Sequence, residues 1–260
     1  MLHQAQAVRP PEARVGAEVT VRNLTRLYGD QPVLDNISFS VRDGERVGVV
    51  GRSGIGKSTL LAVIAGLDEP SSGSVAIGSE TTAEARLARC VLMPQADCLF
   101  PWRTAVGNAA LALENQGVPA SQAQAEASRL FTRLGLDGMQ RLRPYELSGG
   151  MRQRVAFART VLARKPVLLL DEPFGALDTI TRYELQDWLH GYLSDESATV
   201  LLVTHDIEEA LVLCDRVLAF TTSGEIVEVA GFGAEHARRP ELVTDPAFLT
   251  QRAHILEQLS

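Results

Sequence analysis

The sequence predicts an α/β protein with a parallel sheet that helices cover on both faces. The runs 167–170 and 199–203 are apolar and too short for helices, so each is typical of a buried strand. A stretch with helical periodicity separates these two runs, and this alternation of strand and helix is that of a parallel sheet. A glycine-rich loop at 51–58 follows another apolar strand and precedes a helix. In open α/β folds, ligands bind at this edge of the sheet.

The first part of the chain contains mostly short strands. The segments 19–22 and 37–41 alternate between apolar and polar residues, with turn residues between them. The segment 46–50 is an apolar strand that leads into the glycine-rich loop, and a helix is predicted from Lys57 to Ala65, ending at Gly66. Two further short strands are predicted at 75–77 and 90–93.

The pattern then becomes helical over 104–162. Amphipathic helices are predicted at 105–114 and 121–134, and a third contains the apolar positions of 155–162. Another helix, with apolar and aromatic positions over 180–192, lies between the two buried strands of the opening paragraph. From Gly224 onward, the tail predicts one short strand and a final helix at 246–259.

Composition limits the class of protein. The chain has 260 residues, 45% hydrophobic and 22% charged, which suits one large α/β domain or two small ones. No apolar run approaches the roughly 20 residues needed to cross a bilayer. Residues 1–17 have no apolar core of a secretory signal and are expected to form a disordered leader. The three cysteines have no metal-ligand spacing, which favours reduced thiols in the cytosol.

Charge is unevenly distributed along the chain. The net charge of −7 argues against nucleic acid as the main partner. The segment Arg129 to Lys165, however, holds nine basic residues and two acidic ones. This local excess has two interpretations: a solvated helical face, or a surface that meets phosphates or an anionic membrane leaflet.

The loop at 51–58 fits the pattern of a phosphate-binding loop, although an ordinary strand–helix turn is the alternative. Its glycines let backbone N–H groups turn inward around a β-phosphate. Lys57 is expected to reach the β- and γ-phosphates, and Ser58 to hold Mg²⁺. The residues expected to bind the phosphates of a nucleotide are Gly51, Ser53, Gly54, Gly56, Lys57, Ser58 and Thr59.

A second glycine-rich segment, 147–154, begins about ninety residues after the first and precedes a helix. Ser148, Gly149 and Gly150 offer a hydroxyl and free backbone N–H groups to an anion. A chain that binds one nucleotide through its first loop has no obvious need for a second such segment. The arrangement makes sense if each protomer covers the nucleotide held by another copy.

Two acidic residues follow the apolar run 167–170. Asp171 ends this strand at the edge where open α/β sheets bind ligands, so we expect it to be a partner of Mg²⁺. Glu172 is next and is placed to polarise an attacking water, while Pro173 breaks the strand. The alternative is a surface turn with two acidic residues.

Taken together, the motifs resemble those of the ATP-binding subunit of an ATP-binding-cassette (ABC) transporter. The resemblance covers about Val19 to Phe220, and the motifs occur in the family's order: the phosphate loop, Gln95, 147–154, 168–173, 176–178 and 204–206. It implies a phosphate-loop NTPase fold with a mixed sheet, an antiparallel β-subdomain and a helical subdomain at about 97–163. The implied domains are an ATPase domain at 18–230 and a tail at 231–260 with a short helix.

The resemblance also implies roles for single residues in ATP hydrolysis. Tyr28 resembles the aromatic residue that stacks on adenine, although tyrosine is also common at turns. Gln95 resembles the glutamine that binds Mg²⁺ and senses the membrane subunit, with an ordinary loop amide as the alternative. His205 resembles the histidine that contacts the γ-phosphate. Asp178 resembles the aspartate at the dimer interface, and 148–150 the segment that caps the γ-phosphate of the opposite protomer.

A narrower resemblance follows Gln95. The segment 99–104, then Asn108, is similar to importers of the nitrate, sulfonate and taurine group, and the tail resembles the short C-terminal helix of that group. The alternative interpretation of Pro101 and Trp102 is an aromatic residue that packs under a loop.

The function expected from these resemblances is that of an ATPase subunit that energises import of a small solute. Its expected place is the cytoplasmic face of the cell membrane. Its expected partners are a second, identical ATPase subunit, transmembrane permease subunits and, indirectly, an extracytoplasmic solute-binding protein. The alternatives are a soluble ABC ATPase not coupled to transport, a phosphate-loop kinase of a small metabolite, and a non-enzymatic interaction module. Selection of the solute is expected to reside in the permease subunits and the solute-binding protein.

Overall fold

The computed structural model describes residues 16–175, 177–195, 197–221, 224–233 and 242–259. The first fifteen residues of the predicted leader, and residues 234–241 of the predicted tail, lie outside the described residues. Within the described ranges, the helices are too short or too polar to cross a membrane.

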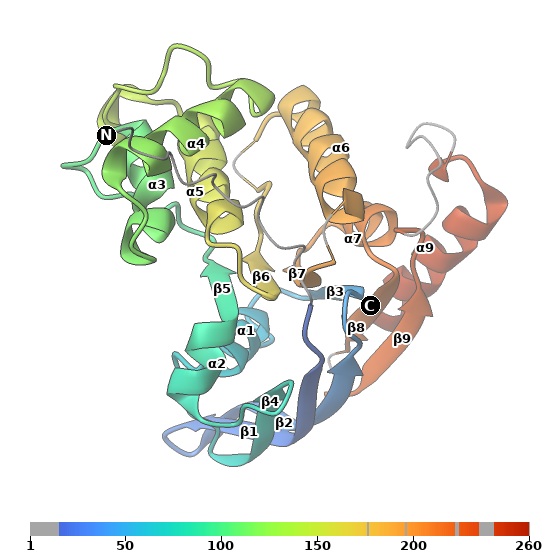
Figure 1. Ribbon diagram of the computed structural model, residues 1–260. Coiled ribbons are helices and arrows are strands. Elements are labelled where there is room, and N and C mark those ends of the chain that lie inside the picture. The colour runs from blue at the N-terminus through green and yellow to red at the C-terminus, as the bar shows by residue number, and fades with distance from the viewer. Residues whose placement is uncertain (1–15, 176, 196, 222–223, 234–241, 260) are drawn as a thin grey trace, which may run out of the picture.

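The described residues form two sheets (Figure 1). The smaller is antiparallel, with the strand order β2-β1-β4. The larger has the order β5-β6-β7-β3-β8-β9, in which only β9 is antiparallel to its neighbour. The strands are β1 (Val19–Tyr28), β2 (Gln31–Val41), β3 (Arg46–Gly51), β4 (Ser72–Ile77), β5 (Cys90–Met93), β6 (Val167–Asp171), β7 (Thr199–Val203), β8 (Arg216–Phe220) and β9 (Ile226–Ala230).

Helices surround the larger sheet, and three of them, α3, α4 and α5, form a group of their own (Figure 1). The helices are α1 (Lys57–Ala65), α2 (Ala83–Arg89), α3 (Ala105–Asn115), α4 (Ala120–Arg133), α5 (Gly149–Leu162), α6 (Thr179–Asp195), α7 (Ile207–Leu213) and α9 (Pro246–Leu259), with a 3-10 turn at Pro144–Glu146.

Strand β6 shows why the apolar runs are buried strands. Leu168 and Leu170 pack into the core that contains α3, α4 and α5. Val167 and Leu169 face the opposite way, into the core formed with α1 and the antiparallel sheet. All four side chains are fully buried, because both faces of the strand are covered. The strand therefore delivers its last residue, Asp171, to the edge of the sheet with no freedom to slip in register.

The predicted elements at 57–65, 90–93, 199–203 and 246–259 match the observed ones residue for residue, whereas the opening strands are longer than predicted. Strand β1 continues to Tyr28, with register shifts after Val21 and Leu24 that break its simple alternation. Asn23, between them, has a φ of 48°, in the left-handed region. These irregularities explain why alternation predicts only the first part of the strand.

Candidate nucleotide-binding site

The loop between β3 and α1 leaves the start of α1 open. Gly56 is the N-cap residue with a φ of 99°, and no side chain caps the helix. A Cβ at this position would lie 2.6 Å from the carbonyl oxygen of Val33, so only glycine fits. The first N–H groups of α1 therefore have no side-chain acceptor, and an anion is their natural partner.

The Lys57 side chain folds back over this loop. Its Nζ donates to the carbonyl oxygens of Gly51 at 2.8 Å and Arg52 at 2.9 Å. Burial lowers the pKa of Lys57, while the nearby carboxylates of Glu172 and Asp171 act in the opposite direction. The ammonium is thus held at the loop by weak neutral acceptors, which a phosphate oxygen can replace.

Asp171, the last residue of β6, lies beside the start of α1. Only 6% of the residue is exposed. Burial raises the pKa of Asp171, and the negative charge of Glu172 adds to this, while a hydrogen bond from Ser58 and the charge of Lys57 oppose it. The structure therefore brings together Lys57, Ser58 and Asp171, three of the residues singled out from the sequence.

Glu172 and His205 form a close pair. The Nδ1 atom of His205 lies 2.6 Å from Oε2 of Glu172. The Glu172 side chain is only 16% exposed, whereas that of His205 is 65% exposed. Glu172 has a φ of 48°, and its N–H donates to the carbonyl oxygen of Val203 at 2.8 Å. The left-handed backbone turns the carboxylate out of the line of β6, toward the residues that follow β7.

Tyr28 lies at the end of β1 and is 52% exposed. Its hydroxyl donates to Oδ2 of Asp68 at 2.7 Å. Sequence reasoning did not single out Asp68, which is forty residues away and has no motif of its own.

Gln95 is exposed and follows β5 in a loop that the helical part of the chain holds in place. Two residues later, Oδ2 of Asp97 accepts a hydrogen bond from Arg152 Nε at 2.9 Å. Arg159 donates to the carbonyl oxygens of Asp97 at 2.8 Å and of Cys98 at 2.7 Å. Both arginines come from α5, so this helix holds the loop after Gln95.

The second glycine-rich segment opens α5. Ser148 is the N-cap residue, and its Oγ accepts from the backbone N–H of Met151 at 3.2 Å. Ser148 and Gly149 are exposed. Asp178 stands at the start of α6, where its Oδ1 accepts from the N–H of Thr181 at 3.1 Å. Among the described residues, no hydrogen bond or ion pair joins Ser148 or Asp178 to the phosphate loop.

The basic run at 129–165 is used largely inside the chain. Arg152 and Arg159 hold the loop after Gln95, and Arg154 donates to the carbonyl oxygens of Leu134 and Gly135. Arg164 pairs with Glu126, and Lys165 donates to the carbonyl oxygen of Ala88. The two interpretations of the run were a solvated face and an anion-binding surface, and neither describes these contacts. The sequence pattern does not show which carbonyl groups lie within reach of each basic side chain.

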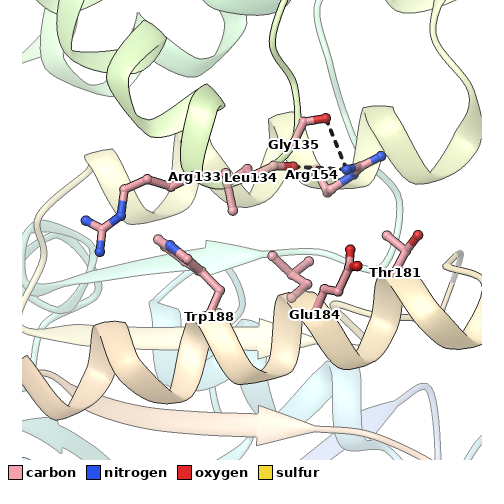
Figure 2. Close-up of a pocket in the computed structure, with 8 residues that line it drawn as sticks. Arg133, Leu134, Gly135, Arg154, Thr181, Glu184 and Trp188 are labelled. Atoms are coloured by element: carbon pink, nitrogen blue, oxygen red, sulfur yellow. Dashed lines mark hydrogen bonds between the residues drawn. The ribbon is translucent and has the colours of Figure 1, made fainter.

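A cavity of about 70 Å³ lies away from the predicted site, between α4, α5 and α6 (Figure 2). Arg154 and Trp188 line it, and each has one buried N–H group, Nε and Nε1 respectively, without a partner. None of the predicted site residues contributes to this cavity, whose size and polar donors suit bound water.

A phosphate-binding loop before α1, with acidic residues at the end of β6 and a histidine after β7, defines the class of a phosphate-loop nucleoside triphosphatase. The profile of the ABC transporter family matches residues 34–175. The chain belongs to this family.

Similar proteins indicate which group of ABC transporters the chain resembles. The aliphatic sulfonates import ATP-binding protein SsuB 1 of Rhodococcus jostii is 48% identical over 197 residues, 76% of each chain. The bicarbonate transport ATP-binding protein CmpD of Synechocystis is 37% identical, over 96% of this chain and 92% of that protein. The nitrate import ATP-binding protein NrtD of Synechococcus elongatus is 40% identical, over 89% of this chain and 86% of that protein. The chain is thus an ATP-binding subunit similar to those of nitrate and sulfonate import systems, as its motifs predict.

Solved structures confirm the predicted fold class. The dimeric structure of MJ0796, a bacterial ABC transporter cassette, has a TM-score of 0.75 and 30% identity, covering 82% of this chain and 98% of that one. A post-hydrolysis state of MJ0796 bound to ADP and Pi gives a TM-score of 0.75 with 29% identity. The two structures support the ABC-ATPase fold of the chain. The second, which is a post-hydrolysis state, also supports its assignment as an ATPase.

Proposed function

We propose that two copies of the chain hydrolyse ATP between them and so drive a membrane permease that imports a small solute. The observation that carries this proposal is the open N-terminus of α1, with Lys57 folded over the loop and two carboxylates beside it. These are the groups needed to hold a triphosphate and to move a proton next to it.

The backbone of the loop holds the phosphates. Free N–H groups at the start of α1 bind phosphate oxygens, and the helix dipole adds to the attraction. Lys57 exchanges its two carbonyl acceptors for oxygens of the β- and γ-phosphates. The full set proposed for the phosphates consists of Gly51, Ser53, Gly54, Gly56, Lys57, Ser58 and Thr59.

The oxygen donors beside the loop fit Mg²⁺. A buried carboxylate hydrogen-bonded to a serine hydroxyl is a suitable pair for a hard cation, and burial already disfavours the bare charge of Asp171. Ser58, Asp171 and Gln95 would hold the ion. When bound, Mg²⁺ neutralises charge on the phosphate oxygens.

Glu172 serves the attacking water. Its carboxylate accepts a hydrogen bond from the water and takes up one of its protons as the bond from the water oxygen to the γ-phosphorus forms. The bond between the γ-phosphorus and the β–γ bridging oxygen breaks in the same displacement, so ADP leaves and inorganic phosphate is formed. His205, paired with Oε2 of Glu172, fixes the direction of the carboxylate. In the proposed complex it also contacts the γ-phosphate. Water activation thus depends on a pair of residues from the ends of two neighbouring strands.

The second half of each site comes from the other copy. Ser148, Gly149 and Gly150 stand at the exposed start of α5, and Asp178 at the exposed start of α6, so both can meet a partner. In the closed dimer, the N-terminus of α5 caps the γ-phosphate held by the opposite protomer. The dimeric state of the similar cassette MJ0796 supports this arrangement. ATP then favours closure because only the closed state makes this contact.

The loop after Gln95 offers a surface to the permease. Trp102 is 68% exposed and its ring lies 5.0 Å from that of Phe100. Asn108, fully buried, holds this turn through hydrogen bonds with the backbone of Phe100 and Thr104. An exposed aromatic pair on a fixed turn favours a protein partner. On this proposal the subunit lies on the cytoplasmic side of the membrane, and the permease with its solute-binding protein selects the solute.

Two experiments test the proposal. The purified chain should hydrolyse ATP with Mg²⁺, and Lys57→Ala should abolish turnover; near-normal turnover in that variant would remove the phosphate-loop assignment. Affinity purification from cells should recover a polytopic membrane protein. Its absence, with ATPase activity intact, would favour an ABC ATPase that is not coupled to transport.

A further inference from the structure

Three side chains form a compact cluster at the end of β1, which we call the Tyr28 clamp: Arg26, Tyr28 and Asp68. The guanidinium of Arg26 makes a two-pronged pair with Asp68, with Nε 2.9 Å from Oδ2 and NH2 2.7 Å from Oδ1. The Tyr28 hydroxyl donates to the same carboxylate at 2.7 Å. The Cζ atom of Arg26 lies 4.6 Å from the centroid of the Tyr28 ring.

The clamp fixes a ring that is otherwise exposed. The side chains of Arg26 and Asp68 are each 22% exposed, whereas Tyr28 is 52% exposed. The hydroxyl bond fixes the tip of the ring, and the guanidinium covers one face within cation–π distance. An exposed tyrosine at a turn is normally free to change rotamer, and here two polar neighbours prevent it.

Asp68 is itself held in place by α1. Its N–H donates to the carbonyl oxygen of Ala62, in the last turn of that helix, at 3.2 Å. The next residues are joined to β1, since the Ser71 N–H donates to the carbonyl oxygen of Thr25 at 2.8 Å and the Leu27 N–H donates to Ser71 Oγ at 3.0 Å. The clamp therefore connects the end of β1 with the helix that begins at the phosphate loop.

The same hairpin also touches the phosphate loop. Tyr28 pairs with Gln31 at the start of β2, and two residues further on, Val33 abuts Gly56. A ring fixed at the end of this hairpin thus has a fixed position relative to the loop that holds the phosphates.

From this geometry we propose that Arg26 and Asp68 are positioning residues, which hold the Tyr28 ring ready to stack on the base of a bound nucleotide. This proposal rests on the proposed function. Fixing the ring beforehand removes the ordering cost from the binding step. The cation on the covered face also draws π-electron density from the ring, which reduces its repulsion with the π face of a base on the other side.

The test compares the binding of a ligand that contains a nucleobase with the binding of a ligand that lacks one. Dissociation constants are measured for ATP and for inorganic tripolyphosphate with the full chain and the variants Arg26→Gln, Arg26→Lys, Asp68→Asn and Tyr28→Leu. Arg22→Gln is the matched control, because Arg22 is an exposed arginine of the same strand.

The expected effects are confined to ATP. Tyr28→Leu should weaken ATP binding about tenfold, as the loss of one stacked base implies. Arg26→Gln and Asp68→Asn should weaken it by about threefold to fivefold, and Arg26→Lys, which keeps a cation, should recover part of the loss. Tripolyphosphate affinity should be unchanged in all variants, as should ATP affinity in Arg22→Gln. In ATPase assays, the KM should rise while kcat stays constant.

A double-mutant comparison separates positioning from general destabilisation. In the Tyr28→Leu background, Arg26→Gln should have no further effect on ATP affinity. Three results would each overturn the proposal. The first is an equal loss of affinity for ATP and for tripolyphosphate, and the second is a loss of ATP affinity from Arg26→Gln that is as large in the Tyr28→Leu background as in the wild type. The third is unchanged ATP affinity in Arg26→Gln and Asp68→Asn. Should a variant fold poorly, Tyr28→Phe, which loses only the hydroxyl bond, is expected to show a smaller loss for ATP alone. Failure of the proposed function is distinct, since the wild-type chain would then not bind ATP.

Discussion

His205 Nδ1 and Glu172 Oε2 lie 2.6 Å apart, although thirty-three positions separate the two residues in the chain. Strands β6 and β7 are parallel neighbours, with Asp171 paired with Val203, so the residues that follow them meet at one edge of the sheet. Asp206, next after His205, caps α7 by accepting from the N–H groups of Glu208 and Glu209. The histidine is therefore held between a strand and a capped helix, and it aims the carboxylate.

Replacing Glu172 with glutamine should stop hydrolysis and leave ATP binding intact. The amide is close in size to the carboxylate but does not take up the proton of the attacking water. With ATP bound and not consumed, the closed dimer should accumulate, and gel filtration with ATP should show it.

Adding Lys57→Ala to that variant provides the control, because the nucleotide is then not held and the dimer should disappear. A Glu172→Gln chain that stays monomeric at saturating ATP would contradict the shared site.

Asp171→Asn should stabilise the ligand-free chain at neutral pH while abolishing hydrolysis. Burial raises the pKa of Asp171, so the folded chain loses stability as pH rises from the ordinary aspartate range, near 4, through the raised pKa. The asparagine variant escapes this loss. Its Tm should exceed that of the wild type by roughly a few °C at pH 7, with no difference at a pH below the ordinary aspartate value.

Asp178→Asn is the matched control, for which the expected change in stability has the opposite sign. The hydrogen bond from Thr181 holds the pKa of the exposed Asp178 below its usual range. This variant should therefore lose stability above the ordinary aspartate pKa. A gain in Tm at pH 7 would contradict the opposite pKa shifts of the two carboxyl groups.

Thiol reagents should modify one cysteine of the native chain. Cys98 is exposed in the loop after Gln95, whereas Cys90 and Cys214 are buried. Burial raises the pKa of the Cys90 thiol to about 11 and that of Cys214 well above its usual value, so both stay protonated. Titration with a chromogenic disulfide should give one fast equivalent, none in Cys98→Ser, and three after unfolding. Fast reaction of more than one thiol in the native chain would contradict the buried positions.

The parallel sheet and the open loop before α1 could be predicted because their signals are local. Fully apolar runs mark β6 and β7, and the glycine spacing marks the loop before α1. Helix α7 was not predicted, since seven residues give little periodicity, and β8 was not predicted although it contains an apolar run. The predicted final helix, by contrast, has the observed bounds.

Contacts between distant residues were not readable. The pairing of Arg26 with Asp68 depends on how the loop after α1 returns to β1, and that of Arg152 with Asp97 on how α5 packs beside the loop after β5. The sequence does not show which group a charged residue contacts, so the contacts of the basic run at 129–165 within the chain could be found only from the fold.

The most direct test of the central claim, that each ATP is held between two copies, is a mixing experiment. Lys57→Ala has a defective phosphate loop and an intact 147–154 segment. Ser148→Arg has the reverse, because the added bulk and charge block closure over a bound triphosphate but spare ATP binding to the monomer. In a mixed dimer, the altered segment faces the defective loop, which holds no triphosphate. Each variant alone should lack ATPase activity. If the sites are shared, a mixed dimer contains one intact site, so the mixture should hydrolyse ATP well above the sum of the separate variants. A mixture no more active than its components would contradict the shared site.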